Sequence, residues 1–119
     1  MSPWEDGCVM LEEPLRGDGV VLELHGEVDV ASSAELRRRL RTAADTGARR
    51  ILVDLSDVSF IDSIAMAAIV GAQRRLPLDG RLALAAHHPY VLLVLEAVGL
   101  RHVVHVFGTR EEAETYLAD

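Results

Sequence analysis

An adjacent carboxylate and hydroxyl, Asp62 and Ser63, are the first residues to consider for chemistry. They stand where an apolar, strand-like run passes into an apolar, helix-like run, so Asp62 suits the N-cap position of a helix. Its carboxylate would accept hydrogen bonds from the first free backbone N–H groups, and Ser63 would then carry its hydroxyl outward. A helix N-terminus also favours a phosphate. Alone, the pair is typical of any helix start, and only its surroundings make it informative.

No other set of residues predicts catalysis or metal binding. The chain has no Lys, which excludes a Schiff-base lysine and the lysine of a phosphate-binding loop. Its single cysteine, Cys8, excludes an internal disulfide and a multi-cysteine zinc site. Asp54 and Asp57 could be considered an acid–base pair, but no catalytic set of nucleophile, base and orienting residue accompanies them. The histidines fall at the ends of different predicted strands and do not form a set of metal ligands: His25, His87, His88, His102 and His105. We therefore expect that the protein is not an enzyme and binds no metal ion or cofactor.

Composition narrows the class of protein further. The 119 residues carry a net charge of −7, which disfavours direct nucleic-acid binding. No apolar run reaches membrane-spanning length, and residues 1–6 lack the basic start of a signal peptide. The arginines between residues 37 and 41 are most simply a solvated helix face, although an acidic partner could use them. We expect one cytoplasmic domain over residues 1–119.

The elements that must position Asp62 and Ser63 follow the order β-β-α-β-α-β-α-β-α. Ser32 and Glu35 have the spacing of a capping box, which predicts a helix from about residue 31 that stops at Gly47. Strands alternating with helices after an initial hairpin predict an α/β fold with a mixed sheet and about four helices. The expected strands are 8–11, 20–24, 51–55, 82–86 and 103–107, and the other helices are 63–76, one from Pro89 to about Gly99, and one after Thr109.

The helix after Asp62 has no polar side chain from Ile64 to Ala72. A surface helix normally has one polar face, so some of these apolar groups must point away from the sheet. The expected sheet-facing stripe is Ile61, Ala65, Ala68 or Ile69, Ala72 and Leu76. The remaining residues are Ile64, Met66, Ala67 and Val70, beside Gly71 and Arg74. They are either covered by neighbouring helices or exposed as a patch for a protein partner or a homodimer, and we favour the patch.

Three segments resemble the STAS domain, the anti-sigma factor antagonist and sulfate-transporter C-terminal family. The main one is VDLSDVSFIDS at residues 53–63; the others are GEVD at 26–29 and LEAVGL at 95–100. They occur in family order and at family-like spacing, and the resemblance runs from about residue 20 to residue 117. It implies the same α/β element order that the sequence pattern predicts.

The resemblance implies a regulator that works by partner switching. In stand-alone antagonists of this family, the serine after the motif aspartate is phosphorylated by a kinase that is also the anti-sigma factor, and Ser63 occupies that place. The unphosphorylated form binds the kinase, the phosphorylated form dissociates, and a phosphatase resets it. ATP and metal then belong to the partner enzymes. The expected partner-binding residues are Asp29, Asp62, Ser63, Ile64, Met66, Ala67, Val70 and Arg74.

One departure from the family pattern follows Ser63. Family members often have Ser or Thr and then Gly there, whereas this chain has Ile64 and Ala65. Ile64 beside the hydroxyl would change which kinase docks or weaken phosphorylation. The stressosome branch of the family tolerates apolar residues at this place. The alternative interpretation is therefore a STAS subunit of a stressosome or of a transport-associated assembly that could bind a nucleotide.

Overall fold

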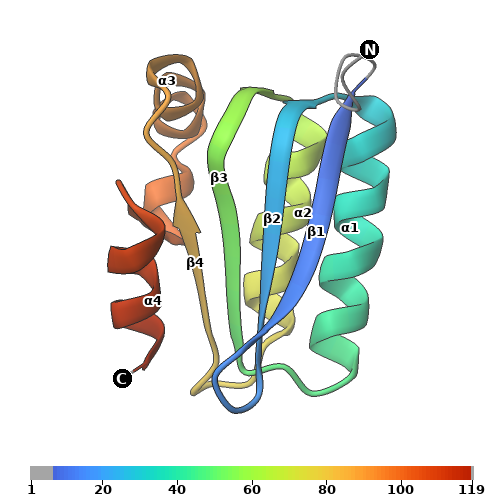
Figure 1. The fold of residues 1–119 in the computed structure, drawn as a ribbon, viewed down its shortest axis with the longest axis vertical. Coiled ribbons are helices and arrows are strands. Elements are labelled where there is room, and N and C mark those ends of the chain that lie inside the picture. The colour runs from blue at the N-terminus through green and yellow to red at the C-terminus, as the bar shows by residue number, and fades with distance from the viewer. Residues whose placement is uncertain (1–6, 119) are drawn as a thin grey trace.

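The computed structural model describes residues 7–118, and its element order is the predicted one. Five strands and four α-helices alternate after an initial hairpin, with a short 3₁₀ helix before the last strand (Figure 1). Their bounds are β1 Cys8–Leu15, β2 Gly19–Val28, α1 Val30–Asp45, β3 Arg50–Ile61, α2 Ser63–Arg75, β4 Arg81–Ala85, α3 Pro89–Ala97, η1 Leu100–His102, β5 His105–Phe107 and α4 Arg110–Ala118.

The sheet is mixed and has the strand order β1-β2-β3-β4-β5. β1 and β2 are antiparallel, and the other neighbours are parallel, as predicted. The predicted end of β3 at Leu55 was wrong, because the strand continues to Ile61. Register shifts between Glu23 and His25 and after Gly26 keep β2 paired with β3 through a polar stretch that looked like a loop.

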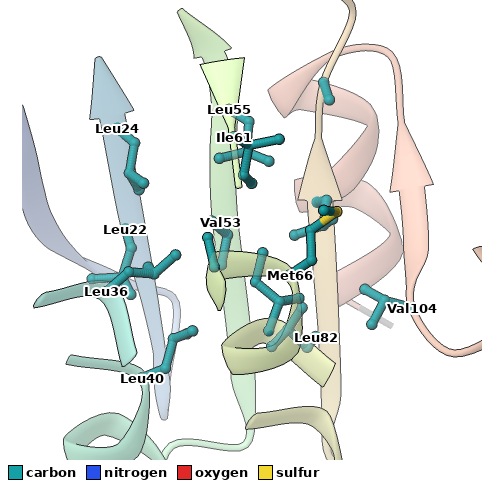
Figure 2. Packing of buried hydrophobic residues seen from close by; sticks show 14 of the residues in the cluster. Leu22, Leu24, Leu36, Leu40, Val53, Leu55, Ile61, Met66, Leu82 and Val104 are labelled. Atoms are coloured by element: carbon teal, nitrogen blue, oxygen red, sulfur yellow. The ribbon is translucent and has the colours of Figure 1, made fainter. Parts of the chain in front are cut away.

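Two apolar layers cover the sheet. On one face, residues of α1, α2 and α3 form a cluster with residues of β2, β3 and β4. Figure 2 shows Leu22 of β2, Val53 of β3 and Leu82 of β4 in this cluster. On the opposite face, α4 packs on Val21 and Leu52 and their β4 neighbours. Successive residues of β3 therefore enter different layers, which explains why its apolar run is continuous.

The start of α1 differs from the prediction. Asp29 is the N-cap, and its side chain forms a reciprocal capping box with Ser32, so Ser32 and Glu35 do not form the box. Glu35 instead lies one turn further along and pairs with Arg38 and Arg39. An aspartate is a strong N-cap, and it begins the helix directly after β2. The helix expected after Thr109 is α4, and the Thr109 hydroxyl accepts a hydrogen bond from the Glu112 N–H at 3.1 Å.

Arginines fasten α4 to the sheet. Arg110, at its start, forms ion pairs with Glu13 of β1, with Glu23 of β2 at 2.7 Å, and with Glu114 at 3.0 Å. The hydrogen bond to Glu13 raises the pKa of the Arg110 guanidinium above its usual range. Arg50 donates from β3 to the Leu117 carbonyl, which satisfies a group that a helix end leaves free. Within residues 7–118, no helix is long and apolar enough to cross a membrane.

Candidate functional site

Strand register brings the two predicted aspartates to the same end of the sheet. Val28 of β2 and Ile61 of β3 are parallel partners, and they are the last paired residues of these strands. Asp29 and Asp62 directly follow them, and each is the N-cap of the next helix. The N-termini of α1 and α2 therefore lie side by side, with a capping carboxylate at each.

Asp62 is held by two hydrogen bonds. Its Oδ1 accepts the Ala65 N–H at 2.9 Å, as expected for an N-cap. The same oxygen accepts the hydroxyl of Ser33 in α1 at 2.6 Å. Ser33 is fully buried, which was not predicted from the sequence, because two serines in a row near a helix start give no sign of which one points inward. This bond ties the start of α2 to α1.

Asp29 is held within its own helix start. Its Oδ1 accepts the Ser32 N–H at 3.1 Å and the Ser32 hydroxyl at 2.7 Å, and the Asp29 N–H donates to Ser32 Oγ at 2.9 Å. Hydrogen bonds from Ser32 lower the pKa of the Asp29 carboxyl below its ordinary value. Asp29 is therefore a fixed negative charge at this end of the molecule.

Ser63 is the first residue of α2 and is exposed to solvent. Among the described residues, its hydroxyl has no hydrogen-bond partner. The Asp62 cap accepts the Ala65 N–H, and the N–H groups of Ser63 and Ile64 have no hydrogen-bond partner within residues 7–118, as is usual at a helix start. The geometry presents an accessible hydroxyl next to unpaired donors, which suits a phosphate in this position.

Exposed apolar side chains surround this end of the sheet. Ile64 is 45% exposed, as expected, and Val30, directly after Asp29, is 69% exposed. Phe60 stacks on Tyr90 of α3, with ring centroids 5.9 Å apart and an angle of 14° between the planes. The exposed positions of Val30, Phe60 and Tyr90 were not predicted from the sequence. The available signal was an aromatic residue two positions before Asp62 in a chain with few aromatics.

The apolar helix α2 is only partly exposed. Ala65, Ile69, Ala72 and Leu76 are buried as predicted. The prediction that Met66 is exposed was wrong: it is 4% exposed and belongs to the same core cluster as Leu82 and Val104 (Figure 2). Val91 and Leu95 of α3 and Leu100 of η1 belong to this cluster as well, so the core that includes Met66 extends beyond the sheet, which helical periodicity alone does not indicate.

The other predicted residues of α2 divide between the core and the surface. Val70 is half-buried against the core, whereas Ala67 and Arg74 are exposed. Residues 7–118 contain no group of three His, Cys, Asp or Glu side chains that could hold a metal ion.

Sequence comparisons place the chain in a family. A sequence model of the STAS domain matches residues 11–113. A protein of Bordetella bronchiseptica described as "Putative anti-sigma factor antagonist BtrV" is 30% identical over 98 residues, which cover 81% of this chain and 84% of that protein. A "Putative anti-anti-sigma factor" of Mycobacterium tuberculosis is 32% identical, over 82% of this chain and 69% of that protein.

Solved structures agree. The structure of the anti-sigma factor antagonist SpoIIAA in its unphosphorylated form matches with a TM-score of 0.80 and 28% identity, over 92% of this chain and 96% of that one. An anti-sigma factor antagonist from Mycobacterium paratuberculosis matches with a TM-score of 0.89 over 98% of both chains, and its 21% identity supports the fold alone. With the mixed sheet and the capped helix starts described above, these matches show that the chain belongs to the STAS domain family.

Proposed function

We propose that this chain is an anti-sigma factor antagonist that binds an anti-sigma factor with serine kinase activity, and that phosphorylation of Ser63 ends the binding. The observation that carries the proposal is the exposed Ser63 hydroxyl at the capped start of α2, which has no hydrogen-bond partner within the described part of the chain. The similarity to proteins named as anti-sigma factor antagonists supports it. SpoIIAA of Bacillus, 28% identical, has also been solved in a phosphorylated form.

The free phosphoprotein should keep its fold. A phosphate on Ser63 would lie at the N-terminus of α2, where the helix dipole and the free N–H groups of Ser63 and Ile64 favour it. The Ser63 side chain is exposed, so the added group needs no rearrangement of the core. Asp62 would remain the cap, since its hydrogen bonds come from Ser33 and Ala65.

The complex with the kinase should not tolerate the phosphate. The exposed apolar side chains of Val30, Phe60, Ile64 and Tyr90 would be covered by a partner. Ser63 lies next to Ile64 in this set, and a phosphate there would add nearly two negative charges that must lose their water. Asp29 and Asp62 would add repulsion. Release of the partner then needs no change of fold, and a phosphatase would restore binding.

This function assigns the chain no catalysis and no cofactor of its own. ATP and its metal ion would be bound by the kinase, and transcription would be affected only through the sigma factor that the kinase releases. With this function the protein would act in the cytoplasm, where sigma factors act. Ile64, 45% exposed beside the phosphate acceptor, would contribute to the choice of kinase.

The test is a pull-down from a lysate of the source organism, with and without ATP, followed by phosphosite mapping and purification of the captured kinase. We expect ATP-dependent labelling that is lost in Ser63→Ala and kept in Ser59→Ala, a matched change at an exposed serine of β3. Ser63→Asp should weaken kinase binding at least about tenfold, whereas Ser59→Asp should not. Labelling that persists in Ser63→Ala would contradict the site. Capture of transporter subunits in place of a kinase would favour the transport-associated alternative.

A further inference from the structure

A surface groove is lined on one side by residues of α1 and on the other by residues of α2. Its volume is about 680 Å³, and Ser63 and Ile64 line one end of it. The floor and walls consist of small or apolar side chains and arginines: Leu40, Ala67, Ala68, Gly71, Ala72, Arg37, Arg41, Arg74 and Arg75. The groove thus combines an apolar floor with cationic walls.

The arginines of the groove differ from the others in the chain. Arg37 and Arg41 on the α1 wall, and Arg74 on the α2 wall, have no hydrogen bond or ion pair within residues 7–118. Among the described arginines only Arg16, in the turn between β1 and β2, shares this state. Arg75 is paired with Asp45 at 2.9 Å. In a chain with a net charge of −7, the unpaired positive charge is therefore concentrated on one groove.

The floor of the groove is open at Gly71. A Cβ built on this residue would meet no atom within 4 Å, and its backbone is not in the left-handed region. The fold therefore does not require glycine here, although glycine weakens a helix interior relative to alanine. The absence of a side chain leaves room for another chain to approach α2 closely.

We propose that this groove binds an acidic amphipathic helix of the anti-sigma factor kinase. Charge complementarity identifies the occupant: carboxylates on both flanks of such a helix would meet Arg37 and Arg41 on one wall and Arg74 on the other, while its apolar face covers Ala67 and Gly71. The wall from Ser63 to Arg74 spans about 16 Å, which matches about three turns of helix.

This inference rests on the proposed function and explains how one phosphate could act over a larger interface. Ser63 lies at the end of the groove, so a phosphate there would face the acidic segment and repel it. The same charge would compete for the nearby arginines. Phosphorylation would then weaken contacts along the groove as well as those around Ile64.

The test measures binding of the purified kinase, identified by the pull-down above, to the full chain by titration calorimetry and stopped-flow mixing. Arg74→Glu should weaken binding at least about tenfold, slow association and reduce the dependence on salt. Arg16→Glu is the matched control, since this arginine is also exposed and unpaired, and it should bind like the wild type. Gly71→Leu should block the groove, whereas Gly71→Ala should bind normally. Thermal melts check that each variant is folded.

The results distinguish failure of the groove proposal from failure of the proposed function. If Arg74→Glu and Gly71→Leu bind like the wild type while Ser63→Asp loses binding, the groove proposal is wrong and the proposed function stands. If Ser63→Asp also binds like the wild type, the proposed function fails. Light scattering and sedimentation with phosphatidylglycerol vesicles test the other occupants. Loss of self-association or of vesicle binding in Arg74→Glu, with kinase binding intact, would likewise overturn the proposal.

Discussion

The hydrogen bond between Ser33 and Asp62 is the most specific contact at the site, and Ser33→Ala removes it. The bond is 2.6 Å long, Ser33 is fully buried, and the acceptor is the cap of the helix that carries Ser63. Alanine fits the same space and suits a helix. The change therefore deletes one interaction with little disturbance of packing.

The expected cost follows from the two opposing effects of this substitution. A hydrogen bond to a charged group contributes about 1.5–3 kcal/mol to stability. Alanine offsets about 0.5 kcal/mol of this loss through its higher helix propensity. The free energy of unfolding should therefore fall by about 1–2.5 kcal/mol, which lowers the melting temperature of a chain of this length by roughly 4–10 °C.

Urea denaturation of Ser33→Ala, Asp62→Ala and the double variant measures the coupling directly. We expect a coupling energy of about 1 kcal/mol, because each single change already removes the shared bond. Ser59→Ala, at an exposed serine, serves as the control and should change stability by less than about 0.5 kcal/mol. If Ser33→Ala behaves like Ser59→Ala and the two site changes are additive, the tie between α1 and α2 does not stabilise the fold.

Three further predictions concern the core, the acid limb of stability and the anchoring of α4. Met66→Ala should cost about 2–5 kcal/mol in urea denaturation, because Met66 is 4% exposed, whereas Ile64→Ala, at 45% exposure, should cost less than about 1 kcal/mol. Similar costs would contradict the burial of α2. Hydrogen bonds from Arg38 and then Arg39 lower the pKa of the Glu35 carboxyl from 4.5 to about 2. The stabilisation that ionised Glu35 gives to the folded state is therefore complete above pH 4.5 and is lost as the pH falls toward 2. Glu35→Gln should therefore flatten this part of the curve of urea midpoint against pH, and an unchanged acid limb would refute the ion pairs. Arg110→Met should destabilise by about 1–2 kcal/mol in thermal melts, and by less in about 1 M NaCl, because these partly exposed ion pairs are screened by salt; a loss that salt does not change would argue against the pairing.

Much of the fold could be predicted, because local sequence patterns favour the same strands, helices and turns that the structure contains. The hairpin, the alternation of strands and helices, the cap at Asp62 and the turn at Gly47, which has a φ of 100°, all follow from short-range preferences. The length of β3 was not predictable, because its polar second half looks like a loop. That half is a strand only because β2 lies beside it and supplies hydrogen bonds as far as Ile61.

For the site, the sequence by itself determined the identity and order of the chemical groups: two aspartates, each before a helix, and a serine after the second. Those residues are local, since an N-cap acts within its own first turn. Only the tertiary structure decided their surroundings. In the folded chain Ser33 donates to Asp62, and Phe60 stacks on Tyr90. Met66 is buried, and the arginine-lined groove lies between α1 and α2. These contacts join elements far apart in the chain, and helical or strand periodicity carries no information about which neighbour will lie across from a given face.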